Sequence, residues 1–171
     1  MGSEMCIRDR TWVESHDTYC NQHESAGLED SVIRAGWTVI TARRDGRPLF
    51  FSRPAGSTRE TYWGNNRIGA RGNDEFFHPE VVAVNNFRHK MKGQPEELYI
   101  ADKGSAVEIA RGDKGTAIVS FSTTPVDIVM PTTLPDGDYT DEVHGTTFKV
   151  DGGKITGTVA PYTSYIIYAE K

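Results

Sequence analysis

The sequence has few cysteines, no long apolar run and no surplus of basic residues, and each shortage excludes a class of protein. The two cysteines among 171 residues, Cys6 and Cys20, are too few for a disulfide-stapled fold or a four-cysteine zinc site. No apolar stretch approaches the roughly 20 residues that span a bilayer, so we expect no membrane partner. Lysine and arginine number 19 against 24 aspartates and glutamates, a net charge of −5. Nucleic acid is therefore not an expected partner, because phosphate contacts need surplus cations.

The composition is typical of a folded globular chain, with 37% hydrophobic and 25% charged residues, 17 glycines and 8 prolines. Its length suits one domain, or one domain with part of another. Residues 1–10, MGSEMCIRDR, show no helical or strand period and lack the apolar core of a signal peptide. Two explanations stay open for this segment: a non-native tail from a translated adapter before a truncated reading frame, or a disordered native tail. We leave it out of the fold prediction.

Residues 11–93 are typical of a strand-helix-strand unit followed by a second helix. A β-rich stretch at 11–16 predicts a strand, and apolar residues at helical spacing over 28–43 predict a helix. The compact apolar run at 48–52 predicts a second, buried strand, parallel to the first. After a long loop, Pro79 opens another helix that ends at Lys92. So few elements cannot close a parallel sheet, and we therefore expect that the chain lacks an N-terminal part of its domain.

Residues 94–171 predict a small all-β domain. Apolar and polar residues alternate over short segments, separated by turn sequences such as Asp113-Lys114-Gly115 and Asp151-Gly152-Gly153. Short strands at this spacing are typical of an antiparallel sandwich. The predicted fold is therefore α/β plus all-β, with the end of an α/β domain at 11–93 and the sandwich at 94–171.

The pair His16-Asp17 stands at the C-terminal end of the first predicted strand, where α/β barrels carry their catalytic groups. Alone, such a pair is more often a local hydrogen-bonded pair or a cap. Glu14 precedes Asp17 by three positions, so a regular strand would point the two carboxyl groups to opposite faces. Glu14 is therefore predicted to be a barrel-wall or interior polar residue rather than a partner of Asp17.

The surroundings of this pair carry a resemblance that covers residues 11–171. The matching stretches are TWVESHDTY at 11–19, ITARRDGRPLFFSRP at 40–54, a long segment at 67–98, LPDGDY at 134–139 and KITGTVAPYTSYIIY at 154–168. These stretches resemble the α-amylases of glycoside hydrolase family 13. The resemblance implies the last βα units of a TIM (β/α)8 barrel, followed by the antiparallel Greek-key β-sandwich called domain C.

The resemblance also implies a function and a set of roles. The family carries out retaining endo-hydrolysis of α-1,4-glucosidic bonds, so starch or maltooligosaccharides are the implied substrates. Asp17 matches the family's second aspartate, which stabilises the transition state by binding the 2- and 3-hydroxyls of the sugar. His16 matches the substrate-binding histidine. Asn21 is a candidate contact to a sugar hydroxyl, with an ordinary solvated loop residue as the alternative.

The family's nucleophile and acid/base lie on earlier barrel strands, so we expect this chain alone to be inactive. A structural calcium is expected in the intact enzyme, with ligands that are not in this chain, and no metal site is assigned to residues here. Secretion and a monomeric state are implied for the intact enzyme. The alternative function is a non-catalytic carbohydrate-binding or structural β-sandwich, and we expect residues 94–171 to bind starch weakly or not at all.

Several other residues carry weaker predictions. Tyr19 and His23, on the loop after the first strand, are placed by the resemblance at the rim of the cleft. Cys20 is predicted to be an inert thiol. Trp63 could stack on a sugar or pack against the core. Three groups of residues are predicted to have no functional role. They are arginines in ordinary salt links (Arg53, Arg59, Arg67 and Arg71), a solvated acidic turn (Asp136, Asp138, Asp141 and Glu142), and core tyrosines (Tyr165 and Tyr168).

Overall fold

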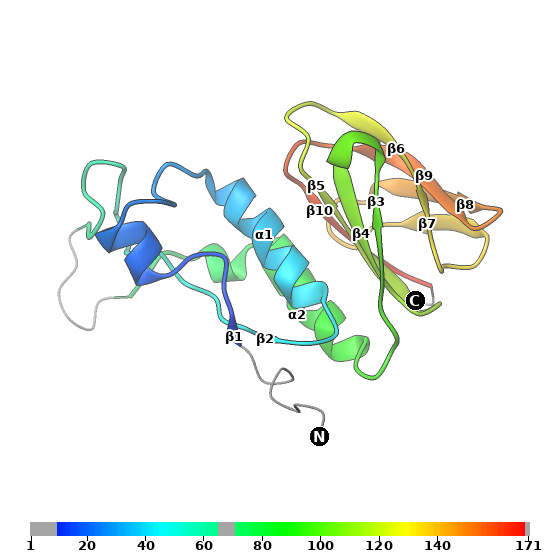
Figure 1. The fold of residues 1–171 in the computed structure, drawn as a ribbon, viewed down its shortest axis with the longest axis horizontal. Coiled ribbons are helices and arrows are strands. Elements are labelled where there is room, and N and C mark those ends of the chain that lie inside the picture. The colour runs from blue at the N-terminus through cyan, green and yellow to red at the C-terminus, as the bar shows by residue number, and fades with distance from the viewer. Residues whose placement is uncertain (1–9, 65–70, 170–171) are drawn as a thin grey trace, which may run out of the picture.

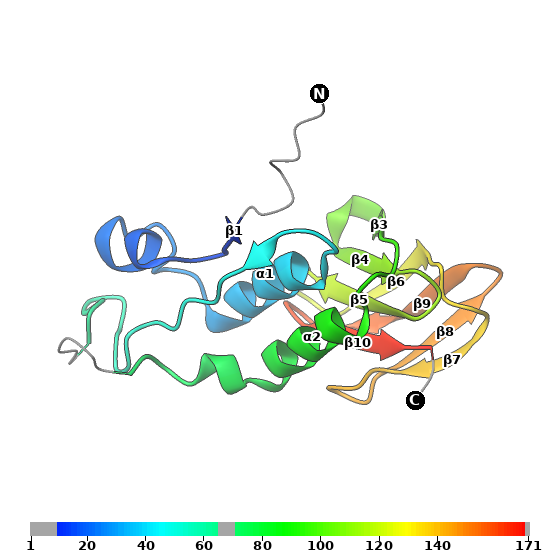
Figure 2. The ribbon, with the colours of Figure 1, turned by 90° about the horizontal axis from the view of Figure 1, so that it is seen from below.

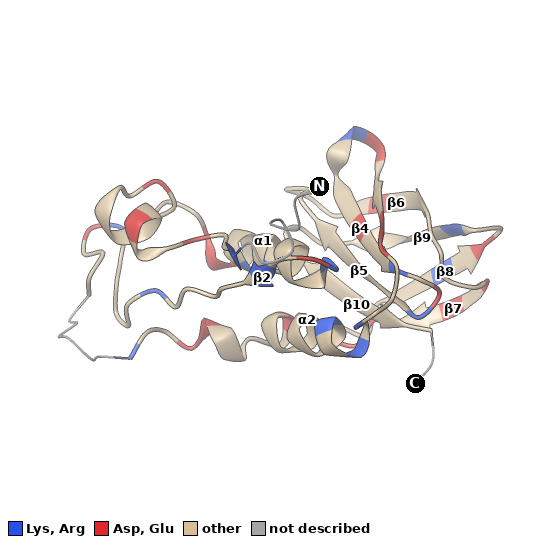
Figure 3. Ribbon diagram, turned by 60° about the horizontal axis from the view of Figure 1, so that its bottom comes forward, with Lys and Arg blue, Asp and Glu red and all other residues tan. Residues whose placement is uncertain are grey.

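The computed structural model describes residues 10–64 and 71–169, and it is layered. The helices α1 (Asp30–Ala42) and α2 (Pro79–Lys90) cover one face of a four-stranded sheet, whose other face packs on a second four-stranded sheet (Figures 1 and 2). Acidic and basic residues are mixed along the described ribbon (Figure 3). No helix in the described part of the chain has the length and apolar character to cross a membrane.

The predicted parallel strand pair exists, but it is much shorter than expected. Strand β1 (Arg10–Thr11) pairs in parallel with β2 (Arg47–Pro48), and α1 connects them. The predicted strands at 11–16 and 48–52 are therefore wrong over most of their length. Within the described residues, β1 and β2 pair only with each other, so neither has a second neighbour to extend it. Leu49, predicted to be buried, is 47% exposed for the same reason.

Both predicted helices are confirmed, and their ends follow from local chemistry. Asp30 places a negative charge in the first turn of α1, which favours the helix dipole. Pro79 occupies the first turn of α2, and the backbone N–H of Glu80 donates to Nδ1 of His78. In α1, Gly36 lies against Val13, and a Cβ there would be 2.8 Å from its Cγ1. Gly36 therefore allows α1 to pack closely on the segment that follows β1.

The predicted antiparallel sandwich is confirmed. The sheet next to the helices has the order β10-β5-β4-β3, built from β3 (Glu97–Ile100), β4 (Ala106–Arg111), β5 (Gly115–Ser120) and β10 (Ser164–Tyr168). The outer sheet has the order β6-β9-β8-β7, built from β6 (Val126–Pro131), β7 (Gly137–Thr140), β8 (Thr147–Asp151) and β9 (Lys154–Val159). Strand β6 pairs with β9 although β7 follows it in the chain, which is a Greek-key order. Short turns η3 (Glu75–Phe77) and η4 (Asp102–Gly104) complete the list of later elements.

The inner sheet is buried on both faces, and its strands show this directly. All six residues of β5 are buried. Ala117 and Val119 face the helices, whereas Ile118 faces the outer sheet. The outer sheet has one covered face, so in β8 only Phe148 and Val150 are buried and the other three residues are exposed.

Two tyrosines and a glycine of the sandwich are also positioned by packing in the core. Tyr165 is 2% exposed in the core between the sheets, and Tyr168 packs against the helix-facing core, so both predictions are confirmed. Gly157 on β9 lies against Phe148, and a Cβ there would be 2.5 Å from Cδ1 of that ring. The phenyl ring therefore occupies the space that any other residue at position 157 would fill.

The side chain of Arg111 on β4 joins the helices to the sheet. It is 2% exposed, and its Nη1 donates to the carbonyl of Ala42 at 2.9 Å. Its Nη2 donates to the carbonyls of Met91 at 3.0 Å and Gln94 at 3.2 Å. The carbonyls of Ala42 and Met91 lie at the C-terminal ends of α1 and α2, where carbonyls lack partners within the helix, and that of Gln94 lies in the connection to β3. The sheet therefore caps both helices through one buried guanidinium.

Glu108, also on β4, is a carboxyl group enclosed between the two sheets. Its Oε1 accepts hydrogen bonds from the hydroxyls of Thr116 at 2.9 Å and Thr132 at 2.6 Å. Its Oε2 is buried and has no hydrogen-bond partner among the described residues. Burial raises the pKa of Glu108 to about 7, against the opposing effect of the two hydroxyl donors.

We predict that this carboxyl group makes stability fall as the pH rises. The folded pKa lies above the unfolded value, so the contribution is complete below the unfolded value and is lost as the pH rises through 7. Between pH 5 and pH 8 the free energy of unfolding should drop by about 2 kcal/mol on this account. Urea unfolding of Glu108→Gln at both pH values should show a flatter dependence, since the amide does not titrate.

The matched control is Asp113→Asn on the exposed β4–β5 turn, which should leave the pH dependence of the unmodified chain unchanged. Parallel pH profiles for Glu108→Gln and the unmodified chain would show that Glu108 is ionised throughout this range.

Candidate functional site

The segment after β1 forms a single wide turn of π-helix, η2 (Asp17–Asn21), where a strand end was predicted. The backbone N–H of Ser15 donates to the hydroxyl of Thr18 at 2.9 Å, and the N–H of Thr18 donates back to Oγ of Ser15 at 3.3 Å. The N–H of Tyr19 donates to the carbonyl of Ser15. Such reciprocal bonds begin a helix, and here they compete successfully with the extended backbone that the β-rich sequence favoured.

The turn brings the three predicted site residues together. Nε2 of His16 lies 3.4 Å from Oδ1 of Asp17, and Nδ2 of Asn21 donates to the same oxygen at 2.8 Å. The side chains of His16 and Asp17 are 65% and 57% exposed. The carboxylate is therefore oriented by a neighbouring amide and open to solvent. The catalytic and binding roles assigned to these residues stay predictions.

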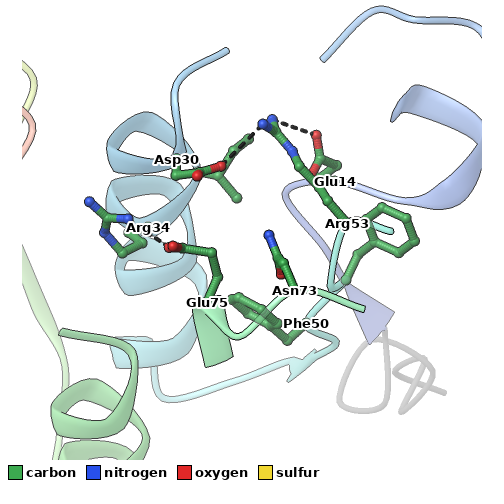
Figure 4. A pocket seen from close by; sticks show the side chains of 9 residues that line it. Glu14, Asp30, Arg34, Phe50, Arg53, Asn73 and Glu75 are labelled. Carbon is green, nitrogen blue, oxygen red and sulfur yellow. Dashed lines mark hydrogen bonds and ion pairs between the residues drawn. The ribbon is translucent and has the colours of Figure 1, made fainter. Parts of the chain in front are cut away.

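Glu14 lies in a different environment, as predicted for an interior polar residue. Its side chain is 2% exposed and forms a two-point ion pair with Arg53: Nε to Oε2 is 2.9 Å and Nη2 to Oε1 is 3.0 Å. Nη1 of Arg53 also donates to Asp30 at 3.1 Å, and Nη2 reaches the carbonyls of Ser25 and Leu28. Figure 4 shows this pair at the N-terminal end of α1. Arg53 thus connects the segment after β1, the loop before α1 and α1 itself.

A small cavity lies beside the Glu14–Arg53 pair. Arg34 and Glu75 form a second ion pair on its wall, with Nη1 to Oε2 at 2.6 Å, and Oδ1 of Asn73 is buried without a partner in the described chain (Figure 4). The cavity volume is about 10 Å³, which is the room for one water molecule. This cavity is too small for a sugar, so it is part of the framework and not a binding site.

Tyr19 is not at a cleft rim, as the resemblance suggested, but is 3% exposed. Its hydroxyl donates to Oγ of Ser57 at 2.8 Å, and its ring packs near Phe51 and Tyr62. The rim prediction assumed a solvent-exposed loop, whereas η2 directs the neighbouring side chains of Tyr19 and Cys20 inward. Cys20 beside it is also buried, and burial followed by the charge of Glu14 raises the pKa of its thiol. The prediction of an inert thiol agrees with this environment.

Trp63 is 53% exposed, so the alternative that it packs in the core is wrong. Its neighbour Tyr62 is fixed, because the ring of His23 stacks on it with centroids 3.7 Å apart and planes 18° apart. Gly64 has a φ of +55°, and a Cβ there would lie 2.5 Å from the carbonyl oxygen of Ala55. Trp63 is therefore an exposed ring on a closely packed loop. The neighbouring Asn65 and Asn66 lie outside the described residues.

The structure also tests the predictions for the other arginines and for the acidic turn. Arg59 pairs with Glu29 at 2.5 Å and Arg71 with Asp74 at 2.5 Å, both pairs being largely exposed, which confirms ordinary salt links. Arg67 lies outside the described residues. In the predicted acidic turn, Asp136, Asp138 and Glu142 are exposed as expected. Asp141 is the exception at 2% exposure, because its carboxylate accepts backbone N–H groups from two elements at once.

The sequence analysis missed the polar framework of Arg34, Glu75 and Arg111. Its prediction of an ordinary, solvated salt link for Arg53 is wrong, because this side chain forms a two-point ion pair with the buried Glu14. A buried charged side chain is uncommon and gives no periodic signal. The sequence signal that could have pointed to Arg53 is its position directly after an apolar strand, opposite the carboxylate at Glu14. Such a placement favours an interior ion pair.

Comparisons with known proteins show that the chain is similar to part of several α-amylases. It is 41% identical over 159 residues to an α-amylase of Butyrivibrio fibrisolvens, covering 87% of this chain and 16% of that protein. It is 36% identical over 169 residues to an α-amylase of Clostridium acetobutylicum, covering 98% of this chain and 20% of that protein. The chain therefore spans no more than a fifth of these relatives. No family model matches the sequence.

Solved structures show the same fold at low sequence identity. The α-amylase I of Eisenia fetida matches 92% of this chain, and 40% of its own, with a TM-score of 0.64 and 16% identity. A variant of that enzyme in complex with maltohexaose matches 80% of this chain and 35% of its own, with a TM-score of 0.57 and 16% identity. The architecture of the helices and the sandwich therefore occurs as part of larger α-amylases.

We predict that Arg53→Gln destabilises the chain strongly, because it leaves the carboxylate of Glu14 buried without its partner. The loss in free energy of unfolding should be about 3–5 kcal/mol, measured by urea unfolding. The matched control Arg59→Gln removes an arginine from an exposed pair and should cost less than about 1 kcal/mol.

The double variant Glu14→Gln/Arg53→Gln should recover part of the lost stability, since it removes the unpaired charge. Equal losses in the free energy of unfolding for Arg53→Gln and Arg59→Gln would mean that the buried Glu14–Arg53 pair stabilises the chain no more than the exposed pair does.

Proposed function

Since this chain is related to α-amylases in sequence and in fold, we propose that it forms the C-terminal part of an α-amylase of glycoside hydrolase family 13. In this proposal residues 11–93 are the last βα units of the catalytic barrel and residues 94–171 are domain C. The observation that carries the proposal is the exposed His16–Asp17–Asn21 cluster, which lies between β1 and α1 of a parallel strand-helix-strand unit. It occurs in a chain that is 41% identical to a named α-amylase.

In this function Asp17 binds the sugar at the cleavage site. Its exposed carboxylate offers acceptor oxygens to the 2- and 3-hydroxyls, and charge-assisted hydrogen bonds are the strong ones. The bonds tighten as the ring flattens toward an oxocarbenium ion, and only binding that improves in the transition state accelerates the reaction. The amide of Asn21 orients one carboxylate oxygen at 2.8 Å. His16 supplies a further polar contact to the same sugar.

The covalent steps of retaining hydrolysis require two further carboxyl groups, one as nucleophile and one as acid/base. Glu14 does not supply either, because both of its oxygens are engaged by Arg53 in the interior. The proposal therefore assigns the nucleophile and the acid/base to residues outside this chain. Starch and maltooligosaccharides are the proposed substrates, in keeping with the maltohexaose complex of the Eisenia fetida variant.

Trp63 adds a second contact to the proposed cleft. Tyr62 packs at the ring of Tyr19 on η2, so the loop that carries Trp63 is attached to the turn that carries Asp17. An exposed indole on a fixed loop provides a flat apolar surface for the face of a pyranose ring. Trp63 is therefore proposed as a stacking residue for the same glucan.

The alternative function is a non-catalytic sandwich. The contacts of the sandwich support a structural role for it but not a sugar-binding one. Arg111 and the apolar face of the inner sheet bind the helices, so the sandwich serves as their support. Two tyrosines of its strands, Tyr99 and Tyr139, are poorly placed to bind a sugar, because both are partly buried against the core between the sheets. The hydroxyl of Tyr139 is also engaged with the carbonyl of Pro135.

Calcium, secretion and a monomeric state are proposed for the intact enzyme only. In residues 10–64 and 71–169, no group of three or more His, Cys, Asp or Glu side chains is arranged to hold a metal ion. The buried Asp141 uses both carboxylate oxygens on backbone N–H groups. The described residues therefore do not fit a calcium site, and no step of the proposed reaction passes through one.

A chimeric enzyme tests the proposal directly. Residues 11–171 would replace the matching segment of the Butyrivibrio fibrisolvens α-amylase, and we expect the chimera to release reducing sugar from soluble starch. Asp17→Asn in the chimera should lower kcat at least about 100-fold, because a transition-state contact is lost. Asp45→Asn, a change at an exposed residue beyond α1, is the control and should leave kcat unchanged.

The 171-residue chain alone should release no more sugar than its Asp17→Ala variant. The proposal fails if the folded chimera is active and Asp17→Asn leaves kcat intact, or if the isolated chain hydrolyses starch well above that control.

Affinity electrophoresis in amylopectin separates the proposed function from a sugar-binding sandwich. We expect the chain to be retarded weakly, and Trp63→Ala should abolish the retardation because it removes the stacking surface. Tyr162→Ala on the sandwich should have no effect. Strong retardation that persists in Trp63→Ala and disappears in Tyr162→Ala would favour the carbohydrate-binding module instead.

A further inference from the structure

The backbone of His23, just after η2, lies in an uncommon conformation. Its φ is +60°, in the left-handed region that residues with a β-carbon occupy at a cost. Among the described residues other than glycine, only Lys103 and Tyr162 also have a positive φ. Residues held in such conformations cluster at active sites and ligand clamps, so the contacts of the His23 side chain bear on function.

The imidazole of His23 contacts two segments that are far apart in the sequence. Its Nε2 donates to the carbonyl of Cys20 in η2 at 2.9 Å. The face of the ring stacks on Tyr62, with centroids 3.7 Å apart and planes 18° apart. One side chain therefore connects the turn that carries Asp17 with the loop of residues 54–64 that carries Trp63.

Tyr62 has further contacts with η2, and they lie in the interior. Its ring meets that of Tyr19 edge-on, with centroids 6.2 Å apart. Its carbonyl accepts a long contact of 3.8 Å from the thiol of Cys20. Tyr19 and Cys20 are both buried, whereas His23 is exposed. Of these three partners, His23 is therefore the one that holds Tyr62 at the surface of the molecule.

We propose that His23 is a positioning residue for the glucan contact of Trp63. This role rests on the proposed function, in which Trp63 stacks on the sugar. Trp63 directly follows Tyr62, so the stack on Tyr62 holds the exposed indole at a set place relative to Asp17. His23 acts through Tyr62 and not on the sugar. Without the imidazole the loop samples more positions, and the apparent affinity falls with the fraction of chains whose indole is in place.

The start of the loop has its own attachments, which do not involve His23. The hydroxyl of Tyr19 donates to Oγ of Ser57 at 2.8 Å, and Nη2 of Arg59 donates to the carbonyl of Gly27 at 3.0 Å. These contacts should keep the loop in place on the chain when the imidazole is removed. We therefore expect the loss of His23 to free the end of the loop and to leave the fold intact.

His23→Asn tests this role, because asparagine tolerates a positive φ and keeps a hydrogen-bond donor but has no ring to stack. Amide nitrogen relaxation of the full chain should give Trp63 a backbone order parameter of about 0.85 in the unmodified protein and below about 0.6 in the variant. Tyr62→Phe keeps both rings of the stack and should retain the unmodified value. His23→Gly, which adopts a positive φ at no steric cost, is a second variant and should behave as His23→Asn does.

Affinity electrophoresis of the full chain in amylopectin, measured relative to a gel without the polysaccharide, gives the binding readout. The retardation of His23→Asn should be at least about three-fold weaker than that of the unmodified chain, because fewer chains present the indole correctly. Tyr62→Phe should be retarded as the unmodified chain is. The matched control is Lys103→Asn, at a residue of the same φ in η4 of the sandwich, which should change neither the retardation nor the order parameter of Trp63.

An order parameter for Trp63 that is below about 0.6 in the unmodified chain, or that His23→Asn and His23→Gly leave unchanged, overturns the positioning role. Full retardation of His23→Asn combined with lost retardation of Trp63→Ala also overturns it, and the stacking contact of Trp63 in the proposed function then stands. Full retardation of Trp63→Ala overturns both the positioning role and that stacking contact.

Discussion

The structure depends on the side chain of Arg111, which is enclosed between the ends of two helices and the face of a sheet. Its guanidinium satisfies carbonyls at the ends of α1 and α2, and Arg88 of α2 satisfies those of Thr41, Arg43 and Gly46 around the end of α1. Unpaired carbonyls at a buried helix end are costly. The two arginines therefore fix where both helices stop and how they lie on the inner sheet.

From that fixed base, the candidate site is positioned through a chain of buried polar contacts. Arg53 holds the segment after β1 against the N-terminus of α1 through Glu14 and Asp30. The turn η2 follows this segment directly, so the place of Asp17 is set by contacts several residues away. The exposed carboxylate needs no burial of its own to be positioned, which leaves it accessible to a hydroxyl-rich ligand.

The periodicity of the sequence predicted both helices and the sandwich, because amphipathic faces and turn residues are local signals. It did not predict the length of β1 and β2, since a parallel strand extends only where a neighbour pairs with it. The acidic turn sequence placed Asp141 in solvent and the resemblance placed Tyr19 on a rim. Both side chains are buried, because burial of a single side chain depends on distant backbone donors and rings. The site residues were found through the resemblance, since a His-Asp pair alone has little specificity. The interior charges of Arg111 and Glu108 had no local signature, since a buried charged side chain gives no periodic signal.

The inner sheet presents Ala117, Val119 and Ile166 to the helices and Ile118 and Ile167 to the outer sheet. The sequence pattern divides the chain into two domains at residue 93, but the helices and the sandwich share one apolar core across this division. A truncated chain that begins at residue 94 would uncover an apolar strip along three neighbouring strands and free the guanidinium of Arg111 in the middle of it. Helices and sandwich should accordingly melt as one cooperative body, and a separately produced sandwich should self-associate through the face it has lost.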